Sequence, residues 1–161
     1  MSRGCFWSVF HNLAAFMRLR SDERHLLLGA LALLPLAQIA AHLLPLPKLI
    51  RLFDLRTTAP ASQSGGLADL PEHLAAATAM RKIFRVIERK FYFWPGKCLA
   101  QALVARFFLR RRGVACLLIL GAKQSTDEAG QLLRAHAWLK AGDIIITGDG
   151  VTDYIPVVFF I

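Results

Sequence analysis

The chain has 161 residues, of which 55% are hydrophobic, and its 20 Lys and Arg against 11 acidic residues give a formal net charge of +9. This length allows one compact domain with an additional element and excludes two full domains, while the apolar content excludes a largely disordered chain. The positive surplus suits an acidic peptide or an anionic membrane surface. The basic segments lack interleaved aromatic residues, so we expect no nucleic-acid partner.

The cysteine content is sparse. Cys5, Cys98 and Cys116 are odd in number and have no C-x-x-C spacing, which fits neither a disulfide framework nor a zinc site. We therefore expect no metal and no other cofactor. Sparse cysteines are typical of a reducing compartment, and residues 1–20 show no secretory signal. The expected location is the cytoplasm.

The first expected region, residues 1–56, is helical in pattern and strongly apolar. A helix-start signal at Ser21-Asp22-Glu23 precedes a nearly unbroken apolar run over residues 26–46. The run is long enough to span a membrane, but Pro35 lacks an amide donor and would kink a spanning helix. We therefore expect two short helices, packed on the rest of the chain or lying on a membrane surface through residues 26–47. A true membrane span is the alternative.

The rest of the chain divides into a linker and a compact domain. Residues 57–68 are rich in small residues, Gly and Pro, which predicts a flexible linker before a domain over residues 69–161. Apolar residues at helical spacing predict a first helix starting near Pro71. A Pro-Gly pair then breaks the chain, and a second helix is expected from Cys98 to Arg112, with Gly113 as its C-terminal cap.

Short strands follow the two helices. An apolar run predicts the first strand, a polar stretch predicts a loop, and two more strands flank an expected tight turn at Ala141-Gly142. In chain order we expect a strand at 114–120, a loop at 123–132, strands at 134–140 and 144–147, and a last strand at 154–161. A cysteine-bearing helix on a small antiparallel sheet, after an N-terminal helical region, predicts an α+β fold.

Cys98 has the setting of a reactive cysteine. It begins a helix, and the positive end of the helix dipole lowers the pKa of a thiol placed there. Lys97 adds a neighbouring positive charge, and the backbone amides at the same helix end suit a developing oxyanion. A cysteine nucleophile also needs a base to ionise it and a group to orient that base.

His136 and Asp149 are the expected base and orienting acid. With the tight turn in place, His136 lies opposite Thr147, and Asp149 lies diagonal to it on the same face of the hairpin. Asp143 and Asp153 are weaker candidates for the acid. A lone Cys or a lone His is more often structural than catalytic, and the prediction depends on their combined order and setting.

Four stretches of the sequence resemble a known family. They are Cys98-Leu99-Ala100-Gln101-Ala102, Leu109-Arg110-Arg111-Arg112-Gly113-Val114, Leu118-Ile119-Leu120-Gly121 and Ala135-His136-Ala137-Trp138-Leu139. Together they resemble the transglutaminase-like cysteine peptidase that removes the leader in lasso-peptide biosynthesis. The resemblance covers roughly residues 68–160. The chain departs from the family at Leu139-Lys140, where an acidic residue usually follows, and in a longer segment before Ala135, which we interpret as an insertion.

The resemblance implies a transglutaminase-like, papain-like core with Cys98 as nucleophile, His136 as base and Asp149 as acid. It implies a ribosomal precursor peptide as substrate and an asparagine-synthetase-like cyclase acting on the product. The chain is too short for its own winged-helix peptide-recognition domain, so we expect a separate recognition protein as partner. Two alternatives stay open. One is acyl transfer or deamidation at the same site, and the other is a non-catalytic, basic, membrane-associated binding protein.

Overall fold

The computed structural model describes residues 21–58, 71–90, 97–127 and 130–161, and it consists of helices followed by one sheet. The elements are α2 (Ser21–Leu43), α3 (Leu46–Leu52), α4 (Pro71–Lys90), α5 (Lys97–Arg110), β1 (Leu117–Asp127), β2 (Gly130–Ala141), β3 (Ile144–Thr147), η2 (Val151–Asp153) and β4 (Ile155–Phe160). The four strands form an antiparallel sheet in the order β3-β2-β1-β4. The expected α+β class, with the Cys98 helix packed on a small antiparallel sheet, is confirmed.

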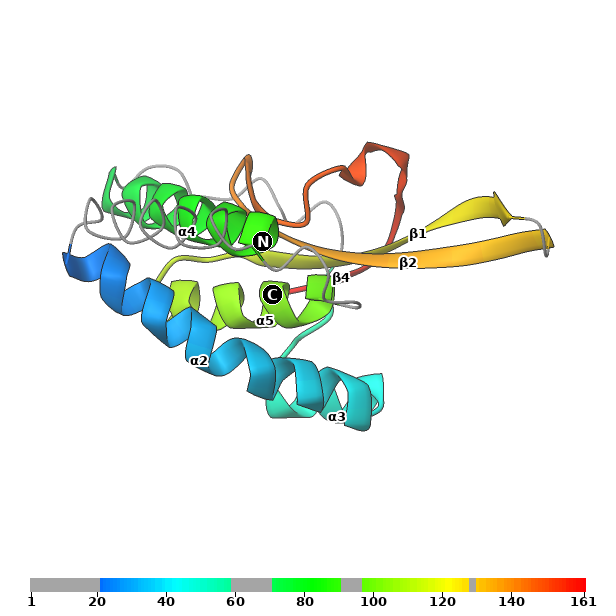
Figure 1. Cartoon of the computed structure of the whole chain (residues 1–161), viewed down its shortest axis with the longest axis horizontal. Helices are drawn as coiled ribbons and strands as arrows, with labels where there is room; N and C mark the ends of the chain where they lie inside the picture. Colours follow the sequence, from blue (N-terminus) through cyan, green and yellow to red (C-terminus); the bar gives the residue numbers. More distant parts are fainter. Residues whose placement is uncertain (1–20, 59–70, 91–96, 128–129) are drawn as a thin grey trace, which may run out of the picture.

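Helix α5 lies at the centre of the fold. It contacts two helices, α2 and α4, and three strands of the sheet, β1, β2 and β3 (Figure 1). Most of its apolar residues are buried, including Ala102 and Leu103, whereas Phe107 is exposed. The helix ends as expected, because Gly113 adopts a φ of 71° and the Val114 amide donates to the Leu109 carbonyl at 3.0 Å. The residue that begins this helix is therefore held by the core on several sides.

The N-terminal region shares this core. Leu26, Leu27 and Ala30 of α2 are buried in the same cluster as the helices and strands that follow. Thr57, the first residue of the expected linker, forms an isolated bridge to Phe160 of β4. The remaining positions of the expected linker, 59–68, lie outside the described residues. The core is thus built from both sides of the expected boundary.

Helix α2 corrects the expectation of two short helices. It runs without a break from Ser21 to Leu43, through Pro35, before the short helix α3 follows. A proline removes one amide donor from a helix, and here the other hydrogen bonds and the packing of α2 along α5 outweigh that loss. The described residues contain one helix, Glu23–Leu43, that is long and apolar enough to cross a membrane. A buried core helix passes the same test, and α2 is partly buried.

A buried arginine fastens the end of the N-terminal region. The guanidinium of Arg106, on α5, donates to the carbonyl oxygens of Phe53 at 2.8 Å, Asp54 at 3.1 Å and Ile161 at 2.7 Å. Its side chain is 3% exposed, so three carbonyl groups replace the water that a buried charge loses. This contact holds the chain after α3 against the last strand.

The strands β1 and β2 form a long two-stranded arm. They stay paired from Leu117 and Lys140 to Asp127 and Gly130, and in Figure 1 they extend to the right well past the helices. The expected polar loop at 123–132 is therefore wrong, because most of it is strand. The sequence of this segment is polar and lacks the alternation of apolar and polar residues that predicts a half-buried strand. The strands nevertheless stay paired there, because backbone hydrogen bonds between β1 and β2 continue outward from the packed part of the sheet.

Candidate active site

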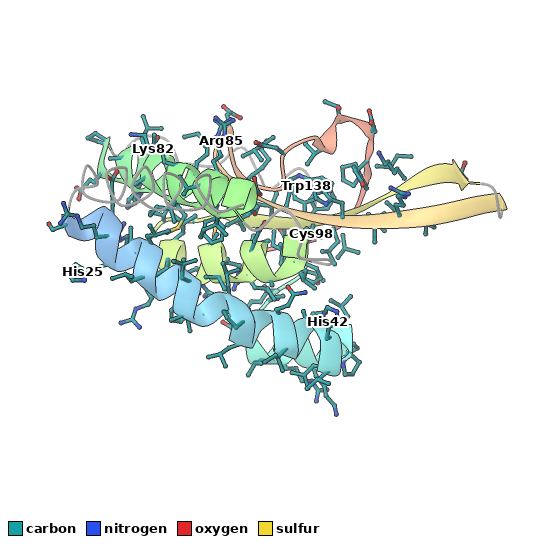
Figure 2. All side chains as sticks on the ribbon, viewed as in Figure 1. His25, His42, Lys82, Arg85, Cys98 and Trp138 are labelled. Carbon is teal, nitrogen blue, oxygen red and sulfur yellow. The ribbon has the colours of Figure 1, made fainter. Side chains whose placement is uncertain are left out.

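Cys98 lies in the first turn of α5, as the second residue of that helix. Its side chain is partly buried and is not in a disulfide. Figure 2 shows it at the sheet-facing start of α5, in the region of Trp138 of β2. The side chain of Lys97 and the expected chain break at 95–96 lie outside the described part of the structure.

His136 of β2 meets Cys98. The imidazole hydrogen-bonds with the Cys98 thiol. Nε2 of His136 is buried against the backbone of Gly148, so we assign the thiol contact to Nδ1. The ring packs at 4.9 Å from the ring of Tyr154 and at 6.1 Å from that of Trp138, which restricts its orientation. Two residues 38 positions apart in the sequence are thus joined as a thiol–imidazole pair.

The environment of Cys98 favours its thiolate. Burial raises the pKa of the Cys98 thiol, but the hydrogen bond with His136, the backbone amide of Ala137, the charge of His136 and the backbone amide of Leu99 together lower it below its ordinary value. These groups act because each places a positive charge or an N–H dipole at the sulfur. The net shift is the one that a nucleophilic cysteine requires.

The environment of His136 favours its protonated form. The hydrogen bond with Cys98 raises the pKa of the imidazole, burial lowers it, and the charge of Cys98, the backbone of Gly148 and the charge of Glu88 raise it again. The net pKa lies above the ordinary histidine value. A lowered thiol pKa and a raised imidazole pKa together favour a thiolate–imidazolium pair.

The expected register of the β2–β3 hairpin is wrong. Ala141 pairs with Ile144, so the turn is Gly142-Asp143, and Gly142 has the positive φ of 56° that a type II′ turn requires at its first position. A β-bulge between Leu139 and Lys140 then places Thr147 opposite Leu139 instead of His136. Because β3 ends at Thr147, the ladder that was expected to carry Asp149 toward His136 does not reach it.

The three candidate acids are all exposed to solvent. The Asp149 carboxylate is 3.6 Å from Nε of Arg85, and it is 54% exposed. Asp153 pairs with Lys123 at 3.7 Å, and Asp143 lies exposed in the turn. The carboxylate whose charge raises the pKa of His136 belongs to Glu88 of α4.

Sequence reasoning missed three residues at this site: Glu88, Gly148 and Tyr154. Tyr154 packs on His136, and Gly148 packs against its Nε2. Gly148 carried a weak signal as one of two glycines that flank Asp149, a pattern typical of a backbone that must turn sharply. Glu88 carried none, because it lies in a charged helix end.

The site is built for chemistry at a carbonyl carbon. A thiolate beside an imidazolium attacks a carbonyl to form a thioester, and the imidazolium supplies the proton for the leaving group. Among the described residues, no group of three His, Cys, Asp or Glu side chains gathers where a metal ion could be held.

Comparison with known proteins gives one match. The model of the transglutaminase-like superfamily matches residues 40–159, a span that includes both Cys98 and His136. No curated protein and no solved structure shows significant similarity to the chain.

Proposed function

The chain belongs to the transglutaminase-like superfamily, and from this premise we propose that it is a cysteine peptidase that removes the leader from a ribosomal precursor peptide in lasso-peptide maturation. The superfamily fits a cysteine peptidase or an acyltransferase kind of function. The observation that carries the proposal is the pairing of the Cys98 thiol with the His136 imidazole at the start of a helix.

The reaction follows from the two groups. His136 takes the proton of Cys98, and the sulfur attacks the carbonyl carbon at the leader–core junction. The peptide C–N bond breaks, His136 gives its proton to the departing amine, and an acyl thioester stays on Cys98. Water activated by His136 then hydrolyses the thioester and frees the thiol. The backbone amide of Cys98 at the start of α5 is placed to donate to the developing oxyanion.

Two features favour leader removal over acyl transfer. The Cys98-Leu99 helix start and the Ala135-His136-Ala137-Trp138 strand resemble the lasso leader peptidase. The net charge of +9 suits an acidic peptide segment. As partners we propose a separate peptide-recognition protein that delivers the leader and an asparagine-synthetase-like cyclase that takes the product.

The proposal is tested by mass spectrometry on the purified chain with its recognition partner and a precursor peptide from a neighbouring reading frame. We expect two fragments whose masses sum to the precursor plus one water. A mass increase on an intact precursor, or a shift of about one dalton, would assign acyl transfer or deamidation instead. An unchanged precursor under conditions in which the partner binds it would contradict both enzymatic functions.

We also propose that α2 and α3 associate with an anionic membrane surface on the cytoplasmic side. Leu28, Leu36, Ile39 and Leu43 are 54%, 62%, 55% and 75% exposed. At about 100° per residue they share one face of α2. Exposed Lys48 and Arg51 follow on α3, where they suit anionic headgroups.

This association is tested by sedimentation with vesicles. Changing both Leu36 and Ile39 to Gln is expected to weaken binding to phosphatidylglycerol-containing vesicles by roughly thirtyfold, since each apolar side chain contributes on the order of 1 kcal/mol. The matched control is Leu133→Gln, because Leu133 is 71% exposed but lies on the β2 arm. Equal binding by all three proteins would contradict a membrane role for α2.

A further inference from the structure

The far side of the His136 ring packs against the backbone of Gly148. Nδ1 faces Cys98, so Nε2 carries the proton of the neutral ring, and the hydrogen-bonding group beside this buried atom is the backbone of Gly148. In a cysteine–histidine site this nitrogen is the one that an orienting group must hold.

Gly148 is the backbone that packs against this nitrogen. A Cβ added at Gly148 would lie 3.0 Å from Nε2 of His136 and 2.8 Å from both the Ala137 carbonyl oxygen and the Trp138 Cβ. The φ of 81° at Gly148 also requires glycine. The backbone at Gly148 therefore lies in close contact with the imidazole, and its position limits how far the His136 ring can move or rotate away from Cys98.

Glu88 fixes that backbone from a third element. Its Oε1 accepts a hydrogen bond from the Gly148 amide at 3.3 Å, across 60 residues of sequence. Glu88 lies near the end of α4, which packs on β3, and its side chain is partly buried. Its carboxylate is thus held on the Nε2 side of the ring, while Cys98 lies on the Nδ1 side.

We propose that Glu88 is the positioning carboxylate of the thiol–imidazole pair and that it acts on His136 through Gly148. The proposal deepens the proposed function, and it rests on that function only for the activity measurement below. Asp149 is the residue that the sequence favours for this role, but its carboxylate is paired with exposed Arg85.

Two effects of Glu88 on His136 follow from this geometry. Its hydrogen bond keeps Gly148 against the ring, which fixes the ring orientation that points Nδ1 at Cys98. Its negative charge stabilises the imidazolium that forms when Cys98 loses its proton, and so it raises the pKa of His136. The other titratable groups that face the ring are Cys98 of α5 and Tyr154 of the segment before β4.

The test measures the His136 titration directly by NMR, without any substrate. The Cys98→Ala protein serves as the background, since it removes the coupled thiol. Adding Glu88→Gln is expected to lower the pKa of His136, because the amide oxygen still accepts from Gly148 while the charge is gone. The control is Glu72→Gln, an identical change on the same helix about 24 Å away along its axis, which is expected to leave the titration in place.

The activity of the native-cysteine protein gives the second measurement. Glu88→Gln is expected to lower kcat for precursor cleavage at least about tenfold with KM little changed. Glu88→Asp, which keeps the charge on a shorter arm, is expected to keep the raised His136 pKa but to lose activity, and it serves if the Gln variant does not fold. An unchanged His136 pKa in Glu88→Gln overturns the proposal. A His136 pKa that changes only in Asp149→Asn also overturns it and assigns the role to Asp149. Because the titration needs no substrate, it decides the role of Glu88 even if leader cleavage is never found.

Discussion

Cys98→Ala is expected to abolish cleavage of the precursor, lowering the single-turnover rate by at least about 10⁴-fold. The reason is that alanine leaves no atom able to form the thioester, while the helix, the sheet and His136 stay in place. Binding of the precursor and its recognition partner is expected to persist, because a partly buried first-turn side chain contributes little to a long peptide interface. Mass spectrometry of timed samples measures the first effect, and co-purification measures the second.

Cys116 provides the matched control within the same chain. Its side chain is 7% exposed, and burial raises the pKa of its thiol to about 11, so it is not a nucleophile at neutral pH. Cys116→Ala is therefore expected to keep the cleavage rate within about twofold, with a stability cost of about 1 kcal/mol for the lost sulfur. Cleavage retained by Cys98→Ala and lost by Cys116→Ala would reverse the assignment of the nucleophile.

The local parts of the site were predictable from the sequence. The apolar content of α5 and the glycine at position 113 predict this helix, and the sequence also predicts that Cys98 lies in its first turn. His136 lies in a stretch with strand character that the structure confirms as part of β2. Both inferences use only neighbouring residues, and local propensity is informative over such short ranges.

The non-local parts were not predictable. The β-bulge at Leu139 and Lys140 shifts the pairing of β3, and no residue type marks a bulge of this kind. The prediction that placed Asp149 near His136 depended on the register of this hairpin, and the observed register differs from the expected one. Glu88 reaches the same place from α4 through a contact across 60 residues of sequence. Tertiary packing alone creates that contact.

The reactivity of Cys98 is expected to depend on His136 in a way that pH reveals. In the native protein the pKa of Cys98 is lowered, so alkylation by iodoacetamide should rise at a lower pH than for an ordinary thiol. In His136→Ala the hydrogen bond and the positive charge are gone, whereas burial, the largest single influence, still raises the pKa. The pKa of Cys98 is therefore expected to rise, and the alkylation curve moves to higher pH than in the native protein.

The measurement is the rate of Cys98 alkylation between pH 5 and 10, followed peptide by peptide so that other cysteines do not contribute. Near pH 6.5 the His136→Ala rate is expected to be at least about tenfold below the native rate, because each unit of pKa changes the thiolate fraction about tenfold below the midpoint. At high pH the two curves should converge, since both thiols are then ionised. Superimposed curves would mean that the helix start and the neighbouring amides alone ionise Cys98. His136 would then have to act only later, as the acid that protonates the leaving amine.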